Sequence, residues 1–153
     1  MNTFRRHQLD KWDRRFLSLA ETVGGWSKGP RKHIGAVIVR PDRSVASLGY
    51  NGPPRGYDDE AFLNMTRDEQ HNVVIHAEHN ALIQAHSREL MAGHTLYVSP
   101  LFPCKGCAQM IADKGIARVV SYCGEISNDW MKSAQLAHAL LVEAGVICVY
   151  VTD

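Results

Sequence analysis

The segments His76-Ala77-Glu78 and Pro103-Cys104-Lys105-Gly106-Cys107 decide the fold and the chemistry expected of this sequence. They supply one imidazole and two thiols. As His76, Cys104 and Cys107, these groups could hold a tetrahedral Zn²⁺ and leave its fourth position for water. Glu78 stands outside this ligand set, where its carboxylate can carry protons to and from that water. Together the two segments predict a catalytic zinc site.

The spacing of the two cysteines favours metal binding at the start of a helix. Cys104 and Cys107 stand three residues apart, just after Pro103, so both sulfurs would lie on one side of the first helical turn. The partial positive charge and unpaired N–H groups of that turn lower the pKa of a thiol. A closed structural zinc site would need a fourth protein ligand. His79, the residue after Glu78, points about a third of a turn away from Glu78 and is therefore a poor fourth ligand. The other histidines in the motif-bearing part of the chain are predicted to be surface or hydrogen-bonded residues: His71, His86, His94 and His138.

Length and composition are those of an ordinary globular protein. The chain has 153 residues, of which 45% are hydrophobic and 22% charged, enough for one domain over residues 1–153 with its own core. The net charge of +1 argues against a large nucleic-acid interface, and no apolar run reaches the length of a membrane span. No apolar run follows Arg5 and Arg6, so we expect no signal peptide. Cys123 and Cys148 are expected to be reduced, buried residues of a cytoplasmic protein rather than ligands of a second metal.

The pattern of apolar residues predicts helices that alternate with strands after an initial hairpin. The expected helices cover residues 10–23, 73–87, 104–114 and 128–144, and the expected strands cover residues 33–40, 44–50, 95–99, 118–123 and 146–151. Residues 51–56 are a Gly/Pro loop, and residues 57–72 have weak periodicity that allows a short helix. This order predicts an α/β fold in which helices cover both faces of a mixed sheet.

These segments resemble the cytidine deaminase-like superfamily and, within it, the deoxycytidylate (dCMP) deaminases. The similarity covers nearly the whole chain and is carried by residues 27–30, 34–39, 49–52, 76–82 and 101–107. It implies a three-layer α/β/α fold with a five-stranded mixed sheet. It also implies zinc-dependent hydrolytic deamination of dCMP to dUMP with release of ammonia. Many members of the family are homo-oligomers, activated by dCTP and inhibited by dTTP.

By their positions in the family's motifs, the resemblance implies that Asn51 hydrogen-bonds to the deoxyribose and that Ala77 and nearby backbone contact the base. Asn51 could instead be only a turn residue, because Asn-Gly is a common turn signal. A substrate phosphate needs cationic or N–H donors, yet residues 123–129 contain two acids and no Lys or Arg. The phosphate would then be bound elsewhere, with Arg55 as the first choice. The other cations considered are Lys28, Arg31 and Lys32.

Other substrates are compatible with the same residues. A modified cytosine nucleotide or another amino-heterocycle would suit the same zinc site. A deaminase that edits nucleic acid would need a basic, aromatic-lined groove for the flanking nucleotides, and the sequence shows no clear one. Gly29 stands where the family commonly has an acidic residue, which leaves the allosteric response open.

Overall fold

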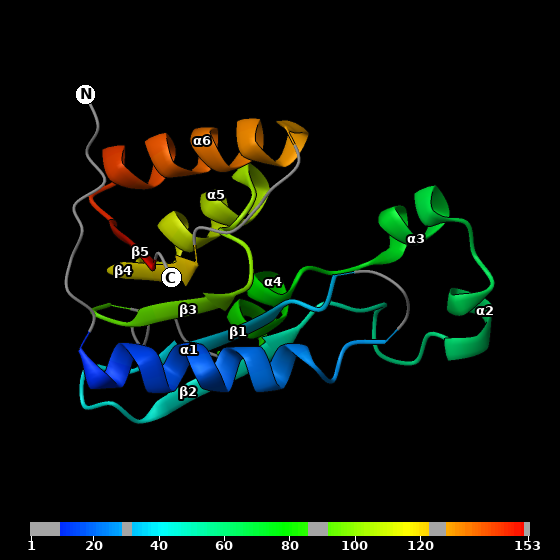
Figure 1. Cartoon of the computed structure of the whole chain (residues 1–153), viewed down its shortest axis with the longest axis horizontal. Helices are drawn as coiled ribbons and strands as arrows, with labels where there is room; N and C mark the ends of the chain where they lie inside the picture. Colours follow the sequence, from blue (N-terminus) through cyan, green and yellow to red (C-terminus); the bar gives the residue numbers. More distant parts are fainter. Residues whose placement is uncertain (1–9, 29–31, 86–91, 123–127, 152–153) are drawn as a thin grey trace.

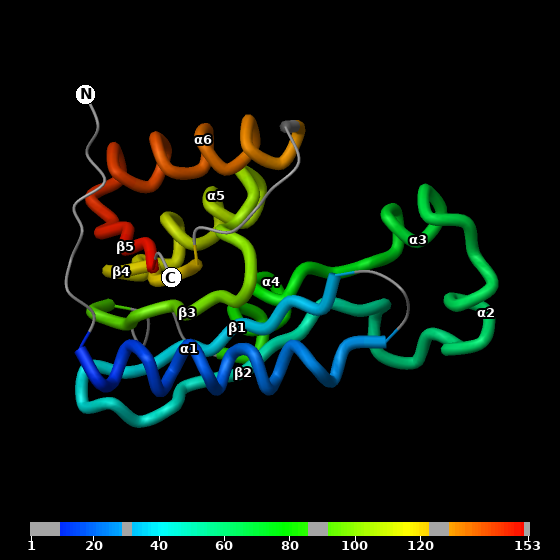
Figure 2. The backbone as a smooth tube through the Cα atoms, in the orientation of Figure 1, coloured from blue at the N-terminus to red at the C-terminus, as the bar shows by residue number. Residues whose placement is uncertain are grey.

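The computed structural model describes residues 10–28, 32–85, 92–122 and 128–151. These residues form six helices and a five-stranded mixed sheet with the strand order β2-β1-β3-β4-β5 (Figures 1 and 2). The strands are β1 (Gly35–Val39), β2 (Val45–Tyr50), β3 (Thr95–Ser99), β4 (Arg118–Tyr122) and β5 (Ile147–Val151). The helices are α1 (Lys11–Gly24), α2 (Asp59–Leu63), α3 (Arg67–Val73), α4 (Ala77–Gln84), α5 (Lys105–Asp113) and α6 (Asn128–Glu143). The residues considered above that lie outside the described ranges are Arg5, Arg6, Gly29, Arg31, His86 and Cys123.

The sheet places the C-terminal ends of β2 and β3 on either side of the first residue of β1. Strand β1 pairs antiparallel with both β2 and β3, whereas β3, β4 and β5 run parallel. Gly35 stands opposite Tyr50 of β2 on one side and opposite Ser99 of β3 on the other. The loop that follows β2 and the loop that leads to the cysteines therefore leave the sheet next to each other.

Each face of the sheet carries its own layer of helices. Helix α1 packs against side chains that alternate along the strands, namely Val37, Val39, Tyr97, Val120 and Val149. On the other face, helices α4, α5 and α6 cover Ala36, Ile38, Leu96, Val98, Val119 and Cys148. The predicted three-layer α/β/α fold with a five-stranded mixed sheet is therefore confirmed. Within the described ranges, no helix combines the length and hydrophobicity that a membrane span requires.

The predicted helix over residues 73–87 is wrong at its start. The chain forms α3, leaves helical geometry at Val74, and starts α4 only at Ala77. The break occurs because Ile75 pairs with Gly52 through two backbone hydrogen bonds of 2.8 and 3.1 Å. An extended residue at this bridge cannot remain in a helix, so a contact distant in sequence overrides the local helical pattern.

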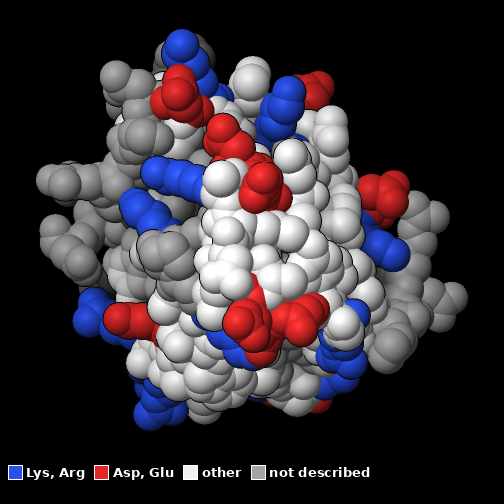
Figure 3. Space-filling model, turned by 90° about the vertical axis from the view of Figure 1, so that its right-hand side faces the viewer, with Lys and Arg blue, Asp and Glu red and all other residues white. Residues whose placement is uncertain are grey.

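Helices α2 and α3 form a lobe that extends away from the sheet (Figure 1). Many of its acids stabilise helix starts: Asp58 caps α2, and Thr66 with Glu69 forms a capping box at α3. Figure 3 views this end of the molecule and shows acidic and basic side chains interspersed. The described residues on this face therefore form no broad basic surface of the kind that binds nucleic acid.

A buried ion pair joins α1 to the sheet. Arg118 donates two hydrogen bonds of 2.7 Å to the carboxylate of Asp13, and the Tyr97 hydroxyl donates a third of 2.7 Å. The Asp13 side chain is 3% exposed. Burial alone would raise the pKa of Asp13, but the hydrogen bonds from Arg118 and Tyr97 outweigh it and hold this pKa below its usual 3.8. Asp13 therefore stabilises the fold as a carboxylate.

We expect Asp13→Asn to lower the free energy of unfolding by about 3 kcal/mol at pH 7, because it leaves Arg118 without its charged partner. A carboxyl whose pKa is lowered by folding contributes stability above its unfolded pKa, and loses it as the pH falls through the folded value. The difference between wild type and variant should thus shrink as the pH falls below about 4. Urea unfolding at pH 7 and pH 3 measures this, with the exposed Asp68→Asn as control. A difference that is equal at both pH values would contradict the ion-pair account.

Candidate active site

Three predicted ligands meet where α4 and α5 begin. The Nδ1 atom of His76 lies 3.5 Å from the Sγ atom of Cys104 and 3.4 Å from that of Cys107. The three ligand atoms all lie within 4.8 Å of one another. Cys107 is buried, and the other two are half-buried. One imidazole and two sulfurs at these separations fit three corners of a tetrahedral zinc site with one position open.

The local backbone explains why these side chains converge. His76 is the N-cap residue of α4, held in extended geometry by the neighbouring Ile75–Gly52 bridge. Cys104 is the N-cap residue of α5, and its sulfur accepts a hydrogen bond from the Cys107 amide at 3.5 Å. Two helix N-termini therefore face the same point, and each adds partial positive charge there.

Contacts with strand β5 and helix α6 hold the loop before Cys104 in place. Phe102 is 1% exposed and packs against Tyr150 of β5 at a ring separation of 4.9 Å. Tyr150 also lies 2.7 Å, through its hydroxyl, from Nδ1 of His138 on α6. The Ser133 hydroxyl of α6 accepts a hydrogen bond of 3.1 Å from the amide of Lys105. Helix α6 and strand β5 thus fix the position from which the cysteines reach the site.

The two thiols share protons unequally. The Cys107 side chain, its backbone amide and His76 together outweigh burial and lower the pKa of Cys104 to about 3. The neighbouring Cys104 sulfur, burial and Glu78 raise the pKa of Cys107. Cys104 therefore favours the thiolate form that a metal ligand needs, and a metal bound to both sulfurs would displace the thiol proton of Cys107.

Glu78 is the buried acid beside this cluster. It is 3% exposed, and one of its carboxyl oxygens accepts a 3.8 Å hydrogen bond from the Cys107 thiol. Burial is the largest influence on this group, and it raises the pKa of Glu78 above the usual value. A raised pKa makes a carboxyl a better proton acceptor, as a proton carrier must be.

Asn51 and Ala77 lie on the two segments that the Ile75–Gly52 bridge holds together. Ala77 is fully buried as the first residue of α4. The Asn51 carboxamide accepts a hydrogen bond from the Ile34 amide and donates one to the Lys32 carbonyl, both of 2.9 Å. An amide has two donors and two lone pairs, so one of each remains for a ligand.

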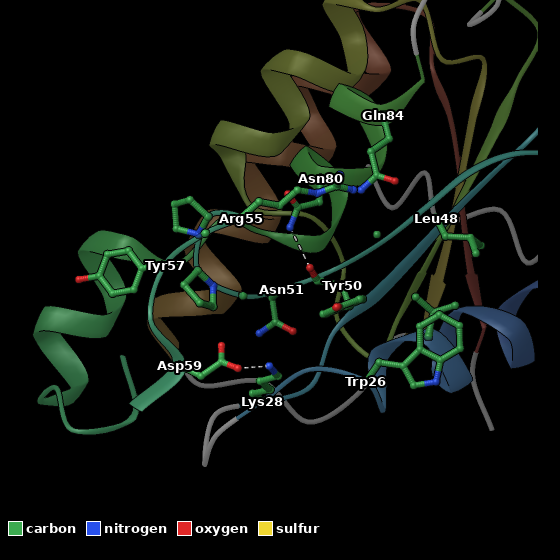
Figure 4. Close-up of a pocket in the computed structure, with 16 residues that line it drawn as sticks. Trp26, Lys28, Leu48, Tyr50, Asn51, Arg55, Tyr57, Asp59, Asn80 and Gln84 are labelled. Atoms are coloured by element: carbon green, nitrogen blue, oxygen red, sulfur yellow. Dashed lines mark hydrogen bonds and ion pairs between the residues drawn. The ribbon is translucent and has the colours of Figure 1, made fainter. Parts of the chain in front are cut away.

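Arg55 lines a pocket of about 400 Å³ along β2 and α4 (Figure 4). In Figure 4 its guanidinium group points toward Asn80 and Gln84. Neither Glu78 nor the three predicted ligands line this pocket. Its main polar and aromatic lining residues are Trp26, Lys28, Tyr50, Asn51, Tyr57, Asp59, Asn80 and Gln84.

Several other candidates among the described residues have partners or surroundings outside the cluster. Lys28 forms an exposed ion pair with Asp59, so its charge already has a partner. His71 is exposed, whereas His94 is buried with its Nδ1 atom 3.1 Å from the Ala92 carbonyl. Neither histidine, nor His79, belongs to the group of possible metal ligands among the described residues.

Sequence reasoning assigned no role to Ser27 or Asn80, which both contact the Asn51 segment. Ser27 donates a hydrogen bond to the Asn51 carbonyl, and Asn80 donates one to the Tyr50 carbonyl. The one signal for Asn80 was its place one helical turn after His76.

Comparisons with known proteins agree with this geometry. Residues 10–123 match the family model described as the cytidine and deoxycytidylate deaminase zinc-binding region. An uncharacterized deaminase from the luxG 3′ region of Aliivibrio fischeri is 38% identical over 142 residues, covering 90% of this chain and 92% of that protein. A probable deoxycytidylate deaminase of Caenorhabditis elegans is 40% identical over 112 residues, or 71% of this chain, which spans only 56% of that relative.

Among solved structures, the dCMP deaminase of cyanophage S-TIM5 in complex with dCMP and dUMP superposes with a TM-score of 0.69. It is 26% identical in sequence, and the match covers 95% of this chain and all of that one. The similarity extends over the whole sheet and both layers of helices, so it is not limited to the metal motif.

We expect about one zinc ion per chain, held by the three residues that converge here. Cys104→Ala should remove most of the bound zinc, because two ligands hold the ion far less tightly than three. Elemental analysis of purified wild type and variant measures the ratio, with Cys148→Ala, a buried cysteine outside the cluster, as the matched control. A Cys104→Ala protein that keeps its full zinc content would refute the assignment.

Proposed function

The chain belongs to the cytidine and deoxycytidylate deaminase family, and we propose that it hydrolyses dCMP to dUMP and ammonia. The observation that carries this proposal is the buried Glu78 carboxyl beside the His76, Cys104 and Cys107 cluster. The names of the relatives and the dCMP and dUMP bound in the cyanophage structure support this choice of substrate.

His76, Cys104 and Cys107 are the residues that would hold zinc in this reaction. When bound, zinc supplies a Lewis acid that makes water reactive enough at neutral pH to attack the cytosine ring. The chain contributes the orientation of the ligands, through two helix starts and the packing of Phe102. The buried surroundings also keep bulk water from competing with the one water that reacts.

Glu78 would be the catalytic proton carrier. The water oxygen forms a bond to C4 of cytosine, and Glu78 takes a proton from that water and passes it to N3 of the ring. The bond from C4 to the amino nitrogen then breaks, and Glu78 passes the second proton of the water to the departing amino group. The products are dUMP and ammonia, and Glu78 returns to its starting state. Its raised pKa suits both the acceptance and the delivery of a proton.

Asn51 and Ala77 would bind the nucleoside. Asn51 keeps one N–H and one lone pair beyond its backbone hydrogen bonds, enough for one sugar hydroxyl. Ala77 sits at the start of α4, where backbone N–H groups have no partner within the helix and can reach acceptors on the base.

Regulation and assembly form the second part of the proposal. We infer that effector nucleotides such as dCTP and dTTP bind the pocket along β2, whose lining includes the aromatic residues Trp26 and Tyr57 and the cation Arg55. Trp26, 55% exposed, and Tyr50, 40% exposed, are in contact with ring centroids 6.3 Å apart, and we propose that a second copy of the chain covers this aromatic pair in a homo-oligomer. Thiol ligands require a reducing compartment, and a cytoplasmic location meets this need.

Wild-type protein should release ammonia fastest from dCMP in a panel with cytosine, cytidine, deoxycytidine, dCTP and 5-substituted dCMP. Glu78→Gln should keep its fold and zinc but lose turnover by at least about a hundredfold, because an amide cannot accept the proton of water. Ammonia assays and zinc analysis measure both. Activity on another amino-heterocycle but not on dCMP would overturn the substrate, and a fully active Glu78→Gln would overturn the proton carrier.

Arg55→Ala distinguishes a substrate phosphate contact from an effector contact. If Arg55 binds the phosphate of dCMP, its loss should lower kcat/KM for dCMP by roughly ten- to a hundredfold and leave slow deoxycytidine turnover unchanged. If Arg55 binds the effector, basal kcat/KM should stay unchanged and activation by dCTP should weaken. Steady-state kinetics with and without dCTP distinguish the two roles. Equal losses of kcat/KM for dCMP and deoxycytidine would show only that the substitution disturbs the loop.

A further inference from the structure

Two side chains hold successive backbone carbonyls of the segment that ends β2. Asn80 of α4 donates a 2.9 Å hydrogen bond from Nδ2 to the Tyr50 carbonyl (Figure 4). Ser27, which follows α1, donates a 2.6 Å hydrogen bond from its hydroxyl to the Asn51 carbonyl. Ser27 and Asn51 are each 7% exposed, so their hydrogen bond is shielded from water. The segment is therefore tied to helices on both faces of the sheet.

Ser27 provides the hydrogen-bond donor for the backbone carbonyl of Asn51. The backbone amide of Asn51 donates to the Ile34 carbonyl at 3.2 Å and so continues the β1–β2 ladder. In a regular ladder the Ile34 amide would donate to the Asn51 carbonyl. Here that amide donates to the Asn51 side chain instead, which leaves the Asn51 carbonyl to Ser27.

The side chain of Asn51 therefore depends on the backbone position that Ser27 and Asn80 maintain. A shift of the Tyr50 and Asn51 carbonyls would turn the carboxamide away from Ile34 and from any sugar it binds. Gly52 transmits the same constraint toward the metal ligands, because it pairs with Ile75 next to His76.

We propose that Ser27 and Asn80 are positioning residues that hold Asn51 in the conformation that reads the sugar hydroxyl of the substrate. This inference rests on the proposed dCMP deaminase function. Neither residue donates to the reacting atoms; both act through Asn51. Preorganisation of a ligand-binding amide by its own supporting hydrogen bonds lowers the cost of ordering it when substrate binds.

The first test compares dCMP with 2′,3′-dideoxycytidine monophosphate, which lacks the sugar hydroxyl. Ser27→Ala and Asn80→Ala should each raise KM for dCMP by about tenfold, the size expected for one lost hydrogen bond, with kcat nearly unchanged. KM for the dideoxy compound should stay within about twofold, since no hydroxyl is there to be read. Ser18→Ala on the exposed side of α1 and Ile83→Ala on the exposed side of α4 are controls that should change neither substrate. Equal losses on both substrates, or no loss on either, would overturn the proposal.

The second test needs no turnover. Hydrogen exchange of the ligand-free protein should be about tenfold faster at the Asn51 and Gly52 amides in Ser27→Ala and Asn80→Ala than in wild type. Unchanged exchange would overturn the positioning role even if KM rises. Faster exchange in a protein that never deaminates dCMP would instead refute the proposed function and leave the support of Asn51 standing.

Discussion

The close packing of strand β2 on helix α4 sets the distance between the Asn51 segment and the metal ligands. Gly49 makes this packing possible, because a Cβ atom at this position would lie 2.4 Å from the Ala77 carbonyl oxygen and 2.6 Å from the Ala81 amide nitrogen. Any other residue would push the helix off the strand and carry His76 and Glu78 with it. The Ser47 hydroxyl completes the contact with a 2.6 Å hydrogen bond to the Ala81 carbonyl. The geometry of the site therefore begins with a strand–helix contact and not with the ligands themselves.

The proposed chemistry makes opposite demands on the groups around the metal cluster. Thiolate ligands need positive surroundings, which the two helix N-termini provide, whereas a proton carrier needs burial that disfavours its charged form. Glu78 meets the second demand because it is one of the buried residues of α4, among Ala77, Ala81 and Leu82. Cys104 meets the first at the more exposed start of α5. The fold places the two environments side by side, because the Glu78 carboxyl lies 3.8 Å from the sulfur of Cys107 on α5.

Sequence could predict the parts of this architecture that depend on local pattern. The alternation of apolar residues predicted every strand and the long helices, and the spacing of His76, Cys104 and Cys107 predicted ligands that the structure brings together. It did not predict the break between α3 and α4, because the Ile75–Gly52 bridge joins residues distant in the chain. For the same reason the direction of Arg55, which points toward Asn80 and Gln84 in Figure 4, could not be predicted, since it depends on the path of the loop after β2.

The pocket along β2 and the metal cluster share structural elements, although neither Glu78 nor the three predicted ligands line the pocket. Asn51 and Asn80 line the pocket, while α4 also presents Glu78 to the cluster. A ligand that fills the pocket must contact the amide of Asn80 or the backbone it holds, because both form part of the wall. Such a ligand would change the stability of the Asn51 segment without touching the reacting atoms. It would therefore act first on substrate affinity, and only a shift of α4 as a whole could extend its effect to Glu78 and the rate of proton transfer.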